Sequence, residues 1–218
     1  MSVVSKRPLF QMICICALVS ALIFSCIGAA SQVSVNPDGS GTIKLEFRIA
    51  QELETMGELD GNENGLPFPA GKKDIERSVA RVPGLRLLSY SSRQDGKDMV
   101  HRAELSFDSP EALSAFFDSG TQQFRVDFPG RRITIRFENT EKTDPAFREL
   151  FVNAFNGYEY SLAFSVPGTA KTRWFDDDGK TAASFPGICS VAGMKADYTV
   201  SMGEMLFLDN PLTLEISW

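Results

Sequence analysis

Residues 33–50 read VSVNPDGSGTIKLEFRIA, and this stretch decides the fold class that the rest of the chain predicts. On both sides of the Pro- and Gly-rich segment 36–41, hydrophobic residues alternate with polar ones, a pattern typical of half-buried strands. The segment therefore predicts a β-hairpin with one face turned to water. The alternating hydrophobic positions are Val33 and Val35 before the turn, and Ile43, Leu45, Phe47 and Ile49 after it.

The alternation of hydrophobic and polar residues recurs along the chain. Residues 85–92 and 98–107 flank Asp95-Gly96, a pair typical of tight hairpins. Ser109 followed by Pro110 has the chemistry of a helix start, because serine caps free N–H groups and proline suits the first helical position. Further strands are expected at 124–128, 133–137, 158–166, 194–200 and 212–218, and helices at 51–59, 73–82, 110–119 and 145–156, with a short helical turn near 203–208.

Strands with one wet face and short connections favour antiparallel pairing, and helices then cover the other face. The sequence therefore predicts an α+β fold: a mostly antiparallel sheet of about eight or more strands, with three to four helices packed on one face. Residues 26–218 are expected to form a single domain, in which the late segment 169–193 is an inserted hairpin and loop.

The N-terminal segment has the features of an export signal. Lys6 and Arg7 give it a positive start, no charged residue occurs in residues 12–30, and small residues close the run. This order of basic, apolar and small residues is typical of secretory signal peptides. It predicts that the rest of the chain lies outside the cytoplasm.

Three ways of processing this segment remain open. In the first, Ile23-Phe24-Ser25-Cys26 is a lipobox, so that residues 1–25 are removed and Cys26 is acylated. In the second, cleavage follows Ala30 and the protein is secreted. In the third, the segment is retained as an N-terminal transmembrane helix, since it approaches the roughly 20 residues that cross a bilayer. The position of Cys26 at the end of the apolar run favours lipidation.

The amino-acid composition limits the classes of molecule that the chain is expected to bind. The net charge is −6, and removal of Lys6 and Arg7 changes it to −8. An acidic chain without a basic cluster argues against nucleic acid as a partner. Four cysteines occur in the sequence, of which Cys26 and Cys189 lie outside residues 1–25, so a framework of disulfides is not expected. Cys189 ends the apolar segment Phe185-Pro186-Gly187-Ile188-Cys189, which is expected to be a loop, and we expect the cysteine to be structural, with a reactive thiol as the alternative.

Two motifs carry candidate chemistry. Asp60, Asn62 and Asn64 have the alternate spacing of calcium ligands in the first half of an EF-hand loop, but Gly71 stands where the bidentate Glu is required. They are a weak calcium candidate, and no other metal or cofactor is expected. His101 is the single histidine and shares a strand face with hydrophobic residues, which favours a packed side chain. A triad or a carboxylate cluster built around it is the enzymatic alternative.

The chain resembles the LppM-type domain of bacterial envelope lipoproteins in two stretches. The first is a signal peptide that ends at a cysteine and leads into VSVNPDGSGTIKLEFRIA, and the second is SLAFSVPGTAKTRW at residues 161–174. The matching positions are the turn 38–41, the segment 166–168 and Trp174. The resemblance implies an α+β domain with a lipid-binding cavity and no enzymatic activity. It defines no binding residue that can be carried over.

Together these features predict a non-enzymatic lipoprotein that is tethered to the membrane through Cys26. Its expected task is to bind an apolar small molecule, a lipid or an envelope partner. The alternatives are an exported enzyme that uses His101 or clustered carboxylates, and an inert structural module at the surface.

Overall fold

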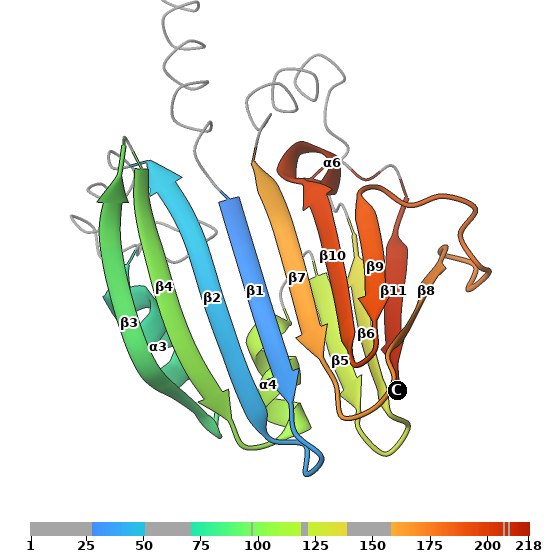
Figure 1. The fold of residues 1–218 in the computed structure, drawn as a ribbon, viewed down its shortest axis with the longest axis horizontal. Coiled ribbons are helices and arrows are strands. Elements are labelled where there is room, and N and C mark those ends of the chain that lie inside the picture. The colour runs from blue at the N-terminus through green and yellow to red at the C-terminus, as the bar shows by residue number, and fades with distance from the viewer. Residues whose placement is uncertain are drawn as a thin grey trace, which may run out of the picture.

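The computed structural model describes residues 28–50, 71–96, 98–118, 122–138, 158–206, 208 and 210–218, and the structural description is confined to them. Of these residues 56% lie in strands and 15% in helices, and the strands form two separate sheets (Figure 1). The predicted α+β fold is therefore wrong. The described part of the chain is mostly β, with a sheet of seven strands, a sheet of four and three short helices.

The larger sheet has the strand order β3-β4-β2-β1-β7-β10-β9. Neighbouring strands are antiparallel except at the centre, where β1 and β7 run parallel. The hairpin predicted at residues 33–50 is confirmed as β1 and β2, but β1 begins five residues earlier than Val33, at Gly28. The strands are β1 (Gly28–Val35), β2 (Gly41–Ala50), β3 (Leu85–Asp95), β4 (Asp98–Phe107), β7 (Glu159–Ser165), β9 (Ile188–Ala192) and β10 (Lys195–Ser201).

The smaller sheet is antiparallel throughout, with the order β5-β6-β11-β8. Its strands are β5 (Gln122–Asp127), β6 (Arg132–Phe137), β8 (Lys171–Phe175) and β11 (Leu212–Ser217). Residues 169–193 therefore contribute β8 to this sheet and β9 to the other one. A tight turn follows β8, in which Phe175 forms an isolated bridge with Thr181.

The two sheets pack through aromatic side chains on their facing sides. The ring of Phe124 lies 6.2 Å from that of Phe164, and the ring of Trp174 lies 4.9 Å from that of Tyr198. Each of these four residues is at most 5% exposed. Aromatic contacts of this kind stabilise a core beyond the area that they bury. The space between the sheets is thus filled by side chains at this point.

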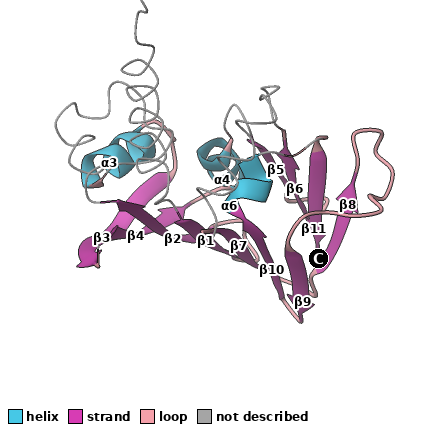
Figure 2. Cartoon of the chain, turned by 90° about the horizontal axis from the view of Figure 1, so that it is seen from above, coloured by secondary structure: helices cyan, strands magenta, loops and turns pink. Residues whose placement is uncertain are grey.

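Three helices lie on the same side of the larger sheet as the smaller sheet (Figure 2). They are α3 (Lys72–Ala80), which contacts β3, α4 (Pro110–Phe117), which contacts β5, and α6 (Met202–Leu206), which contacts β10. In the described residues these short helices share that side of the larger sheet with a second sheet, formed by β5, β6, β8 and β11, so helices alone do not form the expected layer. Alternation along these strands predicts a buried face, but it does not predict which sheet each strand joins.

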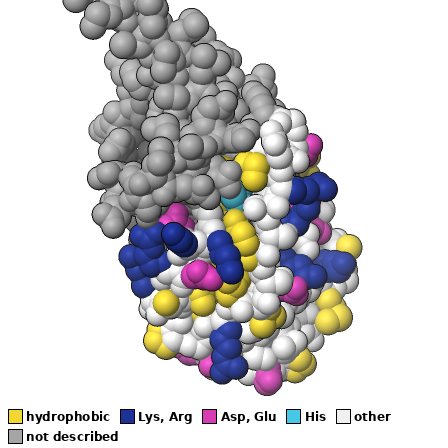
Figure 3. Space-filling model, turned by 90° about the vertical axis from the view of Figure 1, so that its left-hand side faces the viewer, with side chains coloured by type: hydrophobic (Ala, Val, Ile, Leu, Met, Phe, Trp, Pro, Cys, Tyr) yellow, Lys and Arg dark blue, Asp and Glu magenta, His cyan; other side chains and the backbone are white. Residues whose placement is uncertain are grey.

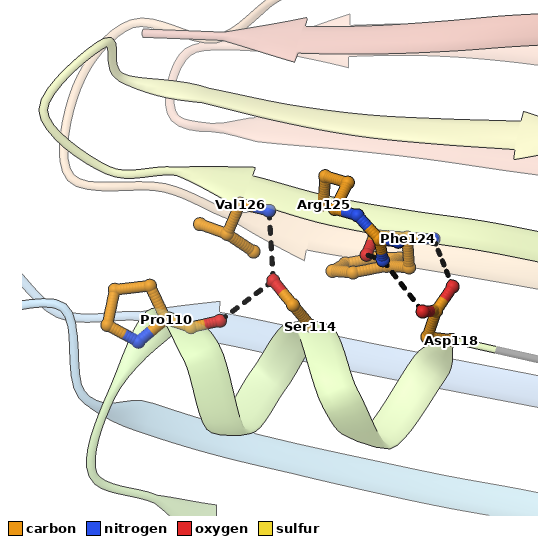
Figure 4. Close-up of polar contacts among 6 residues, drawn as sticks. All are labelled: Pro110, Ser114, Asp118, Phe124, Arg125 and Val126. Carbon is orange, nitrogen blue, oxygen red and sulfur yellow. Dashed lines mark hydrogen bonds and ion pairs between the residues drawn. The ribbon is translucent and has the colours of Figure 1, made fainter.

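Helix α4 is fixed to the smaller sheet by hydrogen bonds of two side chains (Figure 4). Ser114 Oγ donates to the carbonyl of Pro110 over 2.9 Å and accepts from the N–H of Val126 over 3.0 Å. Asp118 pairs with Arg125 over 2.8 Å. The start of the helix is the one predicted, because Ser109 Oγ accepts from the N–H of Ala112. The helix therefore connects the β4 end of one sheet to the β5 edge of the other.

Candidate functional site

A pocket of about 470 Å³ opens at the end of the larger sheet where β1 begins. It lies over β4, β2, β1 and β7, on the face that is turned away from the smaller sheet, here called the outer face. Residues paired across neighbouring strands share a face, and Gly28 pairs with Arg48 while Ala30 pairs with Glu46 and Ser161. The lining residues are Gly28, Ala29, Ala30, Glu46, Arg48, Asp98, Tyr158, Glu159 and Ser161.

The pocket exists because side-chain size changes abruptly from strand to strand. Gly28, Ala30 and Ser161 are small and form a low floor on β1 and β7. Long charged side chains rise on both sides, from Arg48 on β2 and from Glu159 on β7. Since neighbouring strands lie about 4.8 Å apart, β2 and β7 are separated by roughly 10 Å across β1. A small polar molecule fits this width.

Arg48 forms the positive part of the pocket wall. Its Nη2 lies 2.9 Å from Asp95 Oδ2, and its Nη1 lies 3.6 Å from Asp98 Oδ2. Desolvation opposes the charge of the guanidinium, but the hydrogen bonds and charges of Asp95 and Asp98 outweigh it and raise the pKa of Arg48. Arg48 is thus held cationic and in place by two carboxylates, only one of which lines the pocket.

Asp98 is the least exposed charged residue of the lining, at 6%. Its Oδ2 faces Arg48, whereas its Oδ1 is buried and has no hydrogen-bond partner among the residues that the structure describes. A buried acceptor without a donor costs about 1–3 kcal/mol, and more where the group is charged.

The other two carboxylates of the lining differ in their partners. Glu46 accepts a hydrogen bond from Arg102 Nε over 2.7 Å. Lys44 and Glu104 form a second ion pair between β2 and β4, so the two pairs form a row across these strands. Glu159 is exposed and forms no ion pair with any described residue. Viewed from the β3 side, basic, acidic and hydrophobic side chains are intermixed over the described surface (Figure 3). The outer face of the larger sheet thus carries charges of both signs, and Asp98 Oδ1 is the one buried acceptor of the described lining without a partner.

His101, the residue of the enzymatic alternative, lies in the core with an exposed fraction of 0%. Its Nδ1 is 2.6 Å from the hydroxyl of Tyr90, and its ring stacks on Phe47 with centroids 4.9 Å apart. The expectation that it shares a buried strand face is confirmed, since Ala103 and Leu105 on the same face are also buried. In this position the imidazole cannot meet a substrate from solvent.

Cys189 lies in strand β9 rather than in the predicted apolar loop, because residues 188–192 pair with β10. It is a free cysteine of intermediate exposure, and its Sγ lies 3.6 Å from Thr172 Oγ1. It is far from the pocket in the sheet order, in which β9 is an edge strand. The structure therefore does not bring Cys189 and His101 into one site.

Other predicted sites fall outside the described residues. These are Cys26, the calcium candidates Asp60, Asn62 and Asn64, and the helices expected at 51–59 and 145–156. Within the described ranges, no group of three or more His, Cys, Asp or Glu side chains is placed to hold a metal ion. No helix in those ranges is long and apolar enough to span a membrane.

The pocket was not predicted from the sequence. Gly28, Ala29 and Ala30 have the small side chains of a signal-peptide exit, and that interpretation hid their role as the start of a central strand. Asp98 follows a hairpin turn, where an aspartate needs no special explanation. One sequence feature could have indicated the pocket: β1 has small residues on the outer face where the neighbouring β2 has charged ones. This feature can be recognised only when the pairing of β1 with β2 is known.

No protein-family model matches the chain. Among solved structures, the NMR structure of the folded domain of LppM from Mycobacterium tuberculosis is similar, with a TM-score of 0.45 and 11% identity over 88% of this chain and 90% of that chain. This is a weak resemblance of fold. It assigns no ligand and no functional residue to the present chain.

Proposed function

We propose that the chain is a non-enzymatic, extracytoplasmic lipoprotein, tethered through Cys26, that binds a lipid or another envelope component at the membrane surface. The observation that carries the proposal is the position of β1. This strand begins at Gly28, two residues after Cys26, and lies between β2 and β7 in the larger sheet.

The position of β1 bears on how the export segment is processed. Cleavage after Ala30 would remove three strand residues, Gly28 to Ala30, which pair with β2, and the last two of them also with β7. Cleavage before Cys26 leaves the strand complete. The three paired residues therefore favour a tether at Cys26 over secretion without an anchor.

The same geometry supports binding close to the membrane. Two residues of extended chain span at most about 7 Å, so an acylated Cys26 would hold the start of β1 beside the lipid headgroups. The pocket is lined by Gly28, Ala29 and Ala30, and it would face that boundary. The packed aromatic contacts between the sheets give less support to an apolar ligand in the interior.

The tether is tested by metabolic labelling with a clickable fatty acid in a bacterial host, followed by intact mass measurement. We expect label on the wild type and on Cys16→Ala, a matched control in the same segment, and no label on Cys26→Ala. The labelled protein is expected to lack residues 1–25. Equal labelling of wild type and Cys26→Ala, or recovery of the intact chain from the cytosol, would contradict the proposal.

A further inference from the structure

The exposed hydrophobic side chains of the described residues are concentrated at one edge of the larger sheet. Five large ones are exposed, and four of them lie in strand β9 or within three residues of it. These four are Phe185, Ile188, Val191 and Met194, and the fifth is Leu88 on β3. Residues 181–194 contain no charged side chain, although 23% of the chain is charged. Apolar residues gathered in this way indicate a contact with another molecule.

Strand β9 also lacks the features that protect the other sheet edges. An edge strand exposes unpaired backbone groups, and natural proteins guard such strands with charged side chains or bulges. Among the described edge strands, β3 carries Arg86, Arg93 and a bulge after Leu87, β5 carries Arg125 and Asp127, and β8 carries Lys171 and Arg173. Strand β9 has the sequence ICSVA and no bulge. It is therefore the edge at which a further strand can be added.

The register of β10 shows which of its backbone groups face β9. The N–H of Val166 donates to the carbonyl of Met194, and the N–H of Met202 donates to the carbonyl of Tyr158. These bonds continue the pairing of β7 with β10 at its two ends. Bonded and non-bonded pairs alternate along antiparallel strands, so the even-numbered residues of β10 bond to β7 and the odd-numbered ones face β9.

The same alternation identifies the free backbone groups of β9. The odd-numbered residues of β10 pair with Ile188, Ser190 and Ala192. The N–H and C=O groups of Cys189 and Val191 therefore point away from β10, and they have no partner among the described residues. Two donors and two acceptors thus lie in a row along the free side of the strand.

Apolar side chains flank these polar groups on both faces of β9. Val191 pairs with the buried Ala196 and so lies on the inner face, yet it is 42% exposed because it lies at the margin of the core. Ile188 lies on the outer face and is 75% exposed. A strand added here would bury both side chains without bringing a charge close to them.

The free backbone groups decide between the possible occupants. Lipid chains would cover the apolar side chains but leave the four polar groups without partners, which is costly. The edge of a second copy would meet β8 and residues 176–187, which extend past β9 on its free side (Figure 1, Figure 2). A single extended segment needs less room, and its backbone satisfies the four groups.

We propose that the free side of β9 binds an extended, uncharged segment of a partner polypeptide, which adds a strand to the larger sheet. In antiparallel pairing, the more stable arrangement, two residues of the segment form four hydrogen bonds with Cys189 and Val191. Their side chains then lie on the inner face beside Val191, which favours aliphatic residues at alternate positions of the segment. This surface lies away from the pocket, and binding there requires no tether.

The first test uses the full-length chain, purified in a mild detergent with a reductant, and the fluorescent peptide Thr-Val-Thr-Val-Thr. We expect saturable binding in fluorescence anisotropy. N-methylation of both valines removes the N–H groups that face β9 and should weaken binding at least tenfold. N-methylation of the last two threonines, whose N–H groups face away, is the matched control and should change the affinity less than threefold. Absence of binding, or equal losses with both peptides, would overturn the proposal.

Hydrogen exchange measured by NMR examines the edge itself. With the peptide bound, the amides of Cys189 and Val191 should exchange at least tenfold more slowly. The amides of Ser190 and Ala192 already bond to β10 and should slow less than threefold. Protection of neither Cys189 nor Val191 by a bound peptide would place the peptide elsewhere and overturn the proposal.

Substitutions in β9 provide the third test. Val191→Pro removes a free N–H without breaking a bond to β10 and should weaken peptide binding at least tenfold, whereas Val191→Ile keeps that N–H and should change the affinity less than threefold. Val191→Lys adds a protective charge and should also weaken binding at least tenfold. Its matched control is Leu88→Lys on the opposite edge, which should have little effect.

Circular dichroism verifies that each variant is folded, and light scattering measures the oligomeric state. Full affinity in both folded Val191→Pro and folded Val191→Lys would overturn the proposal. A dimer that excludes the peptide and dissociates in Val191→Lys would assign the edge to a second copy, and would likewise overturn it.

Discussion

The inner face of β2 is closely packed, whereas its outer face borders a pocket. The neighbouring residues Phe47 and Arg48 show this difference. Phe47 points to the inner face, is 6% exposed, and stacks on His101 within a filled core. Arg48 points to the outer face and borders the pocket. The apolar face is closed because large side chains meet there. The polar face is hollow because its neighbouring strand carries Gly28 and Ala30.

This comparison places the pocket of the larger sheet on its charged side. A lipid-binding cavity is usually sought on the apolar side of a sheet, beneath helices. In the described residues that side is packed by rings, whereas the polar side offers a pocket of about 470 Å³. Under the proposed function, we therefore expect the chain to contact the polar part of a lipid rather than its acyl chains.

The largest effect on stability is expected from a substitution in the closely packed inner face. Phe164→Ala removes a 2% exposed ring that stacks on Phe124, and we expect the free energy of unfolding to fall by about 3–5 kcal/mol. Urea denaturation followed by circular dichroism measures it. The neighbouring Ala163→Leu lies on the outer face and should change the same quantity by less than about 0.5 kcal/mol. Similar losses in the two variants would show that the faces do not differ as described.

A smaller effect concerns a polar group within the closed face. Tyr198 is 2% exposed, and its hydroxyl donates to the carbonyl of Pro186 over 3.1 Å. We expect Tyr198→Phe to lower the free energy of unfolding at neutral pH by about 1 kcal/mol, the usual net value of one hydrogen bond.

Alkaline pH should reverse part of that loss. Burial raises the pKa of Tyr198 above its ordinary value, with a smaller contribution from the charges of Tyr160 and Glu204. The folded state then holds the phenol proton more tightly than the unfolded state, so this stabilisation is complete below pH about 10 and declines as the pH rises further. Stability should therefore fall less steeply above pH 10 in Tyr198→Phe than in the wild type. Parallel pH profiles of the two proteins would contradict this assignment.

Local chemistry made several of these elements predictable from the sequence. Asp95-Gly96 marks the β3–β4 turn, where Gly96 has a φ of 66°, and Ser109 caps α4 as expected. Both signals act between residues close in sequence. The parallel pairing of β1 with β7 joins Ala29 to Tyr160, and such a distant contact leaves no local pattern.

The division into two sheets was unpredictable for the same reason. Ile135 alternates in β6 as regularly as Ile43 does in β2, yet the two strands belong to different sheets. The pocket depends on that assembly, because its floor and walls come from four strands. Sequence patterns therefore predicted most of the strands and their buried faces, but not β9, whereas the fold class and the candidate site depended on long-range pairing.

The smallest expected effect on stability lies on the outer face and sharpens the comparison. Arg102→Gln breaks the 2.7 Å pair with Glu46, but these side chains are 44% and 43% exposed. Water and salt screen such a pair, so the free energy of unfolding should change by less than about 1 kcal/mol.

The matched control is Lys44→Gln, which breaks the 3.9 Å pair with Glu104 in the same row of ion pairs. Urea denaturation at low and high salt measures both variants, and the small losses of stability should shrink as the salt concentration increases. A loss well above about 1 kcal/mol in either variant would show that the ion pairs of the outer face stabilise the sheet as strongly as its packed inner face does.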